Sequence, residues 1–226
     1  MSYIIRVIEN IIILYFALYF LFDIFLFFFS LFVHKKKRRL KKIDYNGHSI
    51  SIIVPAFNEE VSVVDCVEML SLVEYQEFEI IVVNDGSEDN TLEKLREAFS
   101  FEPRPVLAHQ AIQTNRILSV ESNRERHLIL IDKENGGKAD SINAALNYAS
   151  KRYICTIDAD SILDSLALKK VVIPMIEDER NFVTGGFLAT SNDVVMKGRK
   201  VESYRMPKNL WVLWQIVEYI KSFMIS

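Results

Sequence analysis

Apolar and polar positions divide the chain into one continuous apolar run and a longer part where short apolar runs alternate with amphipathic stretches. The continuous run covers residues 11–33 and carries a single charge, Asp23. At about 1.5 Å per residue, a helix of this length crosses the roughly 30 Å hydrocarbon core of a bilayer. A secretory signal would have a shorter apolar region and a small-residue cleavage site. We therefore predict a retained transmembrane helix.

Lysines and arginines fill most of residues 34–42, directly after this run. The positive-inside rule places such a run in the cytoplasm, with the bulk of the chain, and leaves residues 1–10 on the outer side of the inner membrane. A nucleic-acid patch is the competing interpretation, but a basic run next to a membrane helix does not favour it. We expect contacts with membrane lipids and no nucleic acid. Asp23 is costly in lipid and should face a protein partner or a polar cavity.

From residue 49 the pattern changes to alternating strands and helices, which predicts an α/β domain with parallel crossovers. Continuous apolar strands are typical of sheets covered on both faces, so the strand predicted at 153–157 is expected to be buried. Residues 100–125 read as a connection with one short helix near 111–120, residues 182–184 as a strand and residues 191–207 as a loop. The predicted strands are 49–55, 78–83, 127–131 and 153–157; the predicted helices are 59–72, with Asn58 as N-cap, 91–99, 138–149, 163–176 and 209–225.

Composition and cysteine content bear on the size of the core and on the redox compartment. The chain has 226 residues, of which 50% are hydrophobic and 25% charged, so it can bury a full core. The net charge of −3 is unevenly spread and says nothing about nucleic acid. The two cysteines, Cys66 and Cys155, each lie in an apolar segment. They are typical of small core residues in a reducing compartment rather than of a disulfide or metal framework.

Two carboxylates, Asp158 and Asp160, end the strand predicted at 153–157. Ligands of open α/β sheets bind beyond the carboxyl ends of the strands. Magnesium is typically held there by one or two protein carboxylates together with substrate phosphates, which makes a nucleotide diphosphate a natural ligand. The alternative is that the pair only caps a turn, because aspartates favour turns.

Gly136, Gly137 and Lys138 precede the helix predicted from residue 138. Free backbone N–H groups, the positive end of the helix dipole and one ammonium group make such a helix start receptive to anions. The spacing is not that of the phosphate loop of ATPases. A plain turn into a helix remains the alternative.

Four ordered motifs together resemble glycosyltransferase family 2: residues 54–60, 82–87, 136–146 and 156–160. The apolar segment and the Gly-Gly-Lys-Ala motif further resemble the membrane-embedded processive synthases of cellulose, hyaluronan, chitin and poly-N-acetylglucosamine. The resemblance implies a GT-A fold, which is Rossmann-like with a mostly parallel sheet and helices on both faces, preceded here by one transmembrane helix.

The resemblance also implies roles for matching positions. The donor nucleotide would be bound at the first strand end, with Glu59 near the ribose. Asp85 would hydrogen-bond the uracil, and Lys138 would lie near the donor diphosphate or the base. Mg²⁺ or Mn²⁺ would be held by the aspartate pair, with Asp160 as the more direct ligand. The full set of donor-binding residues implied in this way is Pro55, Ala56, Asn58, Glu59, Asp85, Lys138 and Asp158, and the metal ligands are Asp158 and Asp160.

The function that this resemblance implies is a metal-dependent inverting glycosyltransferase that uses a UDP-sugar, UDP-N-acetylglucosamine or UDP-glucose, for extracellular polysaccharide synthesis. The acceptor would be a polysaccharide or a lipid. One alternative is a membrane enzyme that makes a single transfer to a lipid acceptor; another is a non-catalytic nucleotide-sugar-binding module at the membrane. The family's general-base motif and its Gln-x-x-Arg-Trp motif are missing. We therefore expect a truncated chain, with the base beyond Ser226, that binds donor but turns over poorly.

The expected organisation has five parts: a short extracytoplasmic segment, the transmembrane helix, a basic juxtamembrane linker, the nucleotide-sugar-binding domain, and an amphipathic or interfacial helix that packs on the domain or lies at the membrane surface. Their boundaries are 1–10, 11–33, 34–48, 49–208 and 209–226.

Overall fold

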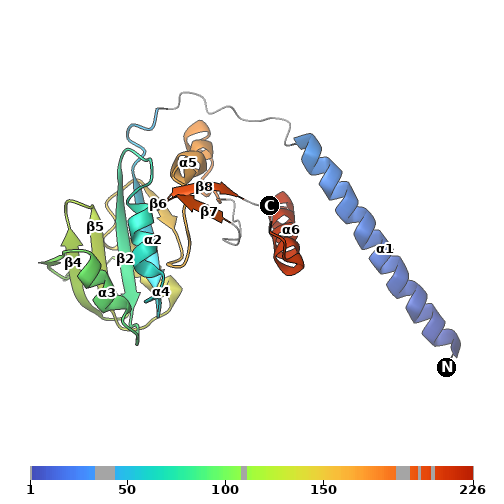
Figure 1. Cartoon of the computed structure of the whole chain (residues 1–226), viewed down its shortest axis with the longest axis horizontal. Coiled ribbons are helices and arrows are strands. Elements are labelled where there is room, and N and C mark those ends of the chain that lie inside the picture. The colour runs from blue at the N-terminus through green and yellow to red at the C-terminus, as the bar shows by residue number, and fades with distance from the viewer. Residues whose placement is uncertain are drawn as a thin grey trace. The chain divides into compact units, whose positions relative to one another are not determined.

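The computed structural model describes residues 2–33, 44–107, 111–186, 194–197, 200–204 and 207–225. The chain separates into two units. One unit contains the N-terminal helix α1 and the C-terminal helix α6. The other holds the sheet and the remaining helices and extends from Asp44 to Gly186, with Ser191–Met206 added (Figure 1).

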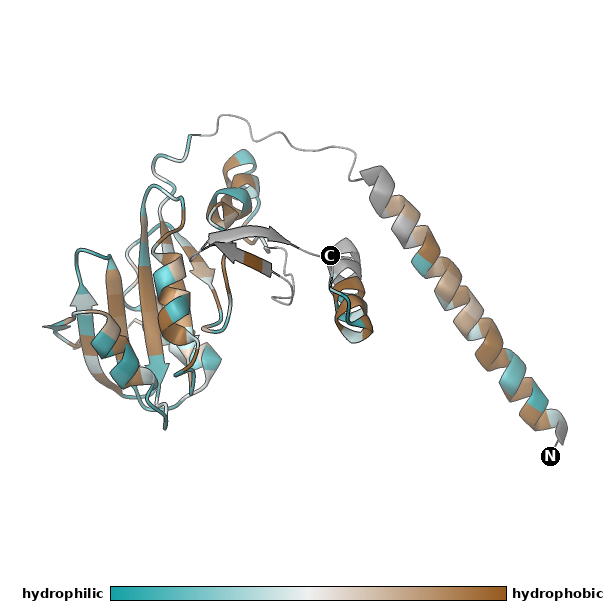
Figure 2. Cartoon of the chain, in the orientation of Figure 1, coloured by the Kyte–Doolittle hydropathy of each residue, from teal (hydrophilic) through white to brown (hydrophobic). Residues whose placement is uncertain are grey.

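Helix α1 spans Ser2–Val33, so the residues predicted to precede the membrane span are helical as well. Within it, Tyr3–Phe25 has a mean hydropathy of 2.0 and is long and apolar enough to cross a membrane by length and composition. Figure 2 shows mostly apolar residues along this helix, and its large apolar side chains are exposed. A helix that is hydrophobic all round needs apolar surroundings. The basic run at 34–43 lies outside the described residues.

Helix α6 spans Leu210–Ile225, close to the predicted range. Trp211 and Trp214 on this helix are 84% and 69% exposed. Large aromatic side chains with one polar group are enriched at membrane interfaces and at protein contacts. The interfacial location of this helix stays a prediction.

The sheet has six strands in the order β3-β4-β5-β2-β1-β6 (Figure 1). Four of them are parallel and form the predicted α/β core, while β3 and β4 are antiparallel and complete one edge. The α/β class with a mostly parallel sheet is therefore confirmed. The strands are β1 (Ile50–Ala56), β2 (Phe78–Asp85), β3 (Glu102–Arg104), β4 (Ile117–Asn123), β5 (Leu128–Lys133) and β6 (Tyr153–Thr156).

Helices cover both faces of the sheet because its central strands are apolar on both sides. Along β1, Ile52 and Val54 face α2, α3 and α5, whereas Ile53 faces α4. Strands β1 and β2 are almost wholly buried. The helices are α2 (Val63–Leu70), α3 (Thr91–Ala98), α4 (Lys138–Leu146) and α5 (Ala167–Glu177).

The strand order reverses at β1. The chain passes from β1 to β2 and then to β5 in one direction, and it returns to place β6 on the other side of β1. In open α/β sheets, ligands bind outside the carboxyl ends of the strands where the order reverses. The carboxyl ends of β1 and β6 border this point.

Strand β6 differs from the prediction. Within the described part of the chain it lies at the edge of the sheet and pairs with β1, and its side chains alternate between half-buried and exposed. Ile154 is 42% exposed. An apolar run does not by itself distinguish a central strand from an edge strand, because burial depends on which elements cover it.

Three local predictions are wrong. Residues 111–120 contain no helix; instead β4 begins at Ile117. Residues 182–184 form no strand. The segment predicted as a loop at 191–207 contains an antiparallel hairpin of β7 (Val194–Lys197) and β8 (Lys200–Tyr204). Strands with one exposed face mix polar with apolar residues, so their pattern is weaker than that of buried parallel strands.

Candidate functional site

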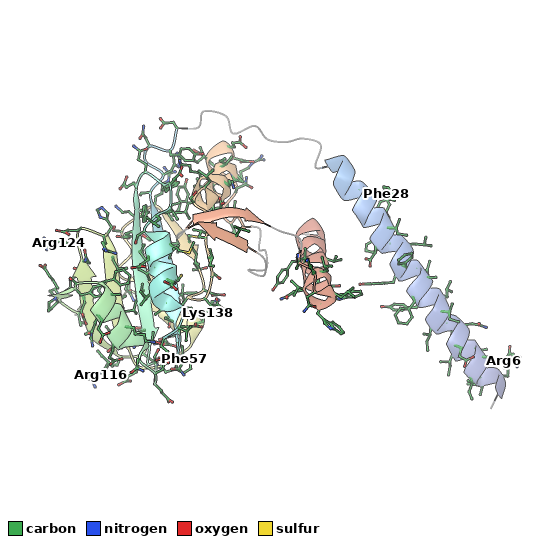
Figure 3. The ribbon with its side chains drawn as sticks, in the orientation of Figure 1. Arg6, Phe28, Phe57, Arg116, Arg124 and Lys138 are labelled. Atoms are coloured by element: carbon green, nitrogen blue, oxygen red, sulfur yellow. The ribbon has the colours of Figure 1, made fainter. Side chains whose placement is uncertain are left out.

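Four loops meet at the carboxyl edge of the parallel strands. They follow β1, β2, β5 and β6, which are neighbours in the sheet and point the same way. Figure 3 shows Phe57 and Lys138 at this end of the sheet domain, and Arg124 at the opposite end. The residues predicted to bind donor or metal lie on these loops or on the strand ends that lead into them, except Lys138, which is the first residue of the helix that follows the third loop.

The loops after β1 and β2 are joined through Asn58. Its backbone N–H donates to Ser87 Oγ at 3.0 Å, and its side-chain Oδ1 accepts from the Glu88 N–H at 2.8 Å. Asn58 has a φ of 57°, a conformation that asparagine tolerates better than most residues. It therefore fixes a turn between the two loops and does not cap α2. The cap position belongs to Ser62.

Glu59 and Glu60 extend this connection. The Glu59 N–H donates to Thr91 Oγ1 at 2.8 Å, and its carboxylate accepts from Ser62 Oγ at 2.6 Å. The Glu60 carboxylate accepts from Asn90 Nδ2 at 2.9 Å. The first two loops of the edge are consequently held to each other by side chains from both.

The Asp85 side chain lies under the loop that follows β5. It is 3% exposed. Its Oδ1 accepts from Lys133 Nζ at 2.5 Å and from the Gly136 N–H at 3.0 Å, and its Oδ2 accepts from the Gly137 N–H at 2.7 Å. A carboxylate offers about four acceptor positions. Three of them are used inside the protein.

These contacts keep Asp85 ionised. Burial alone would raise the pKa of this carboxyl group, but the hydrogen bonds and charge of Lys133 and the backbone N–H groups of Gly136 and Gly137 hold the pKa below its ordinary value. Hydrogen bonds to the charged form favour that form. Asp85 is therefore a fixed negative charge beneath the glycine turn.

Lys133 is a buried charged residue of this edge that the sequence interpretation did not name. It is the last residue of β5 and is 0% exposed. Its ammonium group lies 2.7 Å from Asp140 Oδ2 as well as 2.5 Å from Asp85 Oδ1. The only signal in the sequence is a lysine at the end of an apolar strand, and such lysines are usually exposed.

Lys138 and Asp158 form an ion pair at the surface of the same edge. Their side chains are 60% and 57% exposed, so both can reach a ligand. Lys138 is the first residue of α4, and Asp158 follows β6 in a turn closed by the Ser161 N–H on the Asp158 carbonyl at 3.0 Å. The structure thus connects three of the predicted site residues, Asp85, Lys138 and Asp158, across three loops.

Asp160 and Glu59 lie around the buried thiol of Cys66. Burial raises the pKa of Cys66 to about 12, and the carboxylates of Asp160, Glu59 and Asp158 contribute to this rise. Cys66 Sγ is also 3.8 Å from the Asp158 carbonyl oxygen. The three carboxylates therefore lie close enough to Cys66 to act on its thiol electrostatically.

The donor set fits a hard divalent cation only in part. Within the ranges that the structure describes, no group of three or more His, Cys, Asp or Glu side chains is close enough to form a metal site. The exposed carboxylate of Asp158 and the neighbouring Asp160 match the arrangement in which one or two protein carboxylates hold magnesium and substrate phosphates supply the remaining ligands.

Pro55 and Ala56 lie at the end of β1. Pro55 is half-buried and Ala56 is 1% exposed. A cavity of about 310 Å³ lies elsewhere, at the amino edge of the sheet, and its lining includes Arg104, Arg124 and Lys151. None of the predicted site residues contributes to that cavity.

Sequence comparison finds relatives that match part of the chain. The poly-beta-1,6-N-acetyl-D-glucosamine synthase of Staphylococcus aureus strain COL is 30% identical over 128 residues, which make up 55% of this chain and 25% of that protein. The synthase of the same name from Staphylococcus epidermidis is 30% identical over 116 residues, 51% of this chain and 22% of its own length. The chain thus matches about a quarter of the length of these relatives.

Solved structures also align with the chain. S. aureus TarS 1-349 aligns with a TM-score of 0.42 and 23% identity, over 57% of this chain and 32% of TarS 1-349. The mannosyltransferase PcManGT from Pyrobaculum calidifontis aligns with a TM-score of 0.42 and 22% identity, over 56% and 32%. A family model described as Glycosyl transferase family 2 matches residues 51–225, which is most of the chain. The chain belongs to glycosyl transferase family 2.

Proposed function

We propose that this chain binds the donor of a metal-dependent inverting glycosyltransferase that uses a UDP-sugar to make an extracellular polysaccharide. The observation that carries the proposal is the convergence of Asp85, Lys138 and Asp158 at one edge of the sheet. These residues come from three loops and are linked through the Gly136-Gly137 turn. Family membership supports the reaction class.

The edge suits a leaving diphosphate. Lys138 presents a mobile ammonium group, and the turn before it begins a helix, whose first N–H groups favour negative charge. Asp158 and Asp160 would hold Mg²⁺ or Mn²⁺, which when bound neutralises the charge that develops on the diphosphate. Fixed positive groups that face a developing charge are usually the largest single contribution to catalysis.

The base of the nucleotide would lie over the ends of β1 and β2. Asp85 has one acceptor position left after its three internal hydrogen bonds, and that position suits a single N–H donor such as the one on uracil. Pro55, Ala56 and Asn58 would form the wall of the pocket, and Glu59 would lie near the ribose. The ion pair of Lys138 with Asp158 would open when the diphosphate arrives.

The sugar and the acceptor are proposed from the relatives. Those relatives are named as synthases of poly-beta-1,6-N-acetyl-D-glucosamine, which favours UDP-N-acetylglucosamine over UDP-glucose as donor. Helix α1 would anchor the chain in the inner membrane, with the sheet domain on the cytoplasmic side and membrane lipids as neighbours. The growing acceptor would be a polysaccharide, with a lipid acceptor as the alternative.

The test is release of UDP from UDP-N-acetylglucosamine by the full-length gene product in detergent, with Mn²⁺ or Mg²⁺ present. Asp160→Ala is expected to abolish metal-dependent release. Asp178→Ala is a matched control, because Asp178 is an aspartate that pairs with Arg180 at the surface and lies outside the site. Release that is undiminished in Asp160→Ala would refute the role of the aspartate pair. UDP-sugar binding without hydrolysis or transfer, in the full-length gene product as well, would favour the non-catalytic binding module.

A further inference from the structure

Lys133 is a charged side chain with no exposed surface. Lysines are almost never fully buried unless they are paired. Its three ammonium protons have three partners: Asp85 Oδ1 at 2.5 Å, Asp140 Oδ2 at 2.7 Å and the Glu134 carbonyl oxygen at 2.5 Å. One buried cation thus satisfies two carboxylates from different elements.

Those carboxylates lie on either side of the glycine turn. Asp85 ends β2 and accepts the backbone N–H groups of Gly136 and Gly137. Asp140, in the first turn of α4, accepts the Asn115 N–H at 3.1 Å. Lys133 therefore lies beneath the turn and connects the end of β2 to the first turn of α4.

The turn also fits tightly against this network. A Cβ atom on Gly136 would lie 2.5 Å from Asp140 Oδ2, and one on Gly86 would lie 2.7 Å from the Asn135 nitrogen. Asn115 Nδ2 donates to the Asn135 carbonyl at 2.7 Å. The path of the backbone from Asn135 to Gly137 is set by these contacts.

Lys138 follows this turn directly. It is the first residue of α4, and its ammonium group is an exposed cation of the edge. The location of Lys138 depends on the preceding residue, Gly137. The N–H of Gly137 donates to Asp85, and the Asp85 carboxylate accepts from Lys133. A shift of about 1 Å in a positioning contact can cost about 100-fold in rate.

We propose that Lys133 is a positioning residue for the donor diphosphate: it ties Asp85 and Asp140 together beneath the Gly136-Gly137 turn and so sets the location of Lys138. This inference rests on the proposed function. It assigns to Lys133 no contact with the ligand. It also gives Asp140 a role in the site, as the second carboxylate that Lys133 holds.

The experiment compares the full chain with four variants. Lys133→Met removes the cation, Lys133→Arg keeps the charge with a different shape, and Asp140→Asn removes one carboxylate while the Lys133–Asp85 pair stays balanced. Lys170→Met is the matched control, because Lys170 is an exposed lysine that pairs with Asp164 and is not among the partners of Lys133, Asp85 or Asp140. The dissociation constant of UDP with Mn²⁺, the free energy of unfolding and amide exchange at Gly136 and Gly137 are measured for each.

Lys133→Met is expected to weaken UDP binding by about 10–100-fold, with Lys133→Arg recovering part of the affinity. Asp140→Asn is expected to weaken UDP binding by about 3–10-fold. Its free energy of unfolding should fall less than that of Lys133→Met, because the Lys133–Asp85 pair remains. Amide exchange at Gly136 and Gly137 should quicken in both. Lys170→Met should bind UDP as the unmodified chain does.

Asp140→Asn keeps the test decisive if Lys133→Met does not fold. Wild-type UDP affinity together with wild-type amide exchange in Asp140→Asn would overturn the proposal. If the unmodified chain binds no UDP, the proposed function fails and the positioning role is judged on amide exchange alone. Unchanged exchange at Gly136 and Gly137 in Asp140→Asn then overturns it.

Discussion

Strand β2 carries a buried carboxylate at each end, and the two are satisfied in different ways. Glu79, near its start, accepts from Ser51 Oγ at 2.6 Å, from the Ser150 N–H at 2.6 Å and from Ser150 Oγ at 2.9 Å. Asp85, at its end, accepts from Lys133 and from two glycine N–H groups. The first network is neutral apart from the carboxylate itself, whereas the second includes a buried cation.

The two networks also differ in which parts of the molecule they connect. The Glu79 network joins β1, β2 and the segment before β6, and it ends there. The Asp85 network continues through the glycine turn to Lys138 and Asp158, which are exposed. A buried charge pair is weak evidence for stability, because desolvation offsets the attraction. Its placement beneath exposed charged groups is what suggests a binding role.

Asp85→Asn should have the largest effect. The substitution replaces one acceptor oxygen with an NH₂ donor that faces either a glycine N–H or the Lys133 ammonium, so charge-assisted hydrogen bonds are lost without compensation. We expect the free energy of unfolding to fall by about 3 kcal/mol, together with a loss of UDP affinity. Urea unfolding and calorimetric titration with UDP measure the two effects. Retained stability with wild-type UDP affinity would contradict the comparison.

Glu79→Gln, the matching change at the other end of β2, should cost less. Hydroxyl groups can rotate from donating to accepting, so Ser150 Oγ can accept from the new amide. We expect a loss of about 1 kcal/mol in the free energy of unfolding and an unchanged dissociation constant for UDP. If UDP affinity falls as far as in Asp85→Asn, the two ends of β2 do not differ in function.

Lowering the pH should remove the contribution of Asp85 to the free energy of unfolding. The pKa of Asp85 is lowered in the folded state, so its contribution to stability is present above the ordinary pKa of an aspartate and is lost as the pH falls through the folded value. Urea unfolding between pH 7 and about pH 3 is the measurement, since an unperturbed aspartate titrates near pH 3.9. The unmodified chain should lose more stability over this range than Asp85→Asn does. If the free energy of unfolding falls equally with pH in the unmodified chain and in Asp85→Asn, the ionised form of Asp85 does not stabilise the fold.

Two glycines provide the most closely matched test. Gly137 at the site and Gly47 before β1 have φ values of 84° and 73°, and a Cβ atom on either would meet nothing within 4 Å. Replacing either with alanine should cost about 1–2 kcal/mol from backbone strain alone. Only Gly137→Ala should also weaken UDP binding, because Gly137 donates to Asp85 and Gly47 lies away from the site. Equal UDP affinity in the two variants would mean that the turn does not position the ligand.

The parallel core could be predicted from sequence because its strands are continuous apolar runs that end in polar residues. Those polar ends also placed Asp85 and Asp158 at one edge, since parallel neighbours share a carboxyl edge. Strand β4 was missed because one of its faces is partly exposed and carries Ser119 and Glu121. The edge position of β6 was missed because its apolar run resembles a central strand.

The Lys133 network was beyond prediction for a different reason. A lysine in a sequence suggests an exposed side chain, and its burial here depends on Asp85, which lies 48 positions away. Asn58 was expected to cap a helix because asparagine is common at N-caps. Its partners Ser87 and Glu88 lie on another loop, and such contacts follow only from the way the sheet brings the two loops together.

The most direct test of the central claim is a calorimetric titration of the full chain with UDP, once with Mn²⁺ and once with EDTA. A diphosphate held at the carboxyl edge through a cation on the aspartate pair predicts binding that is about tenfold or more tighter with Mn²⁺. Equal affinity in Mn²⁺ and EDTA, or no binding in either, would contradict that claim.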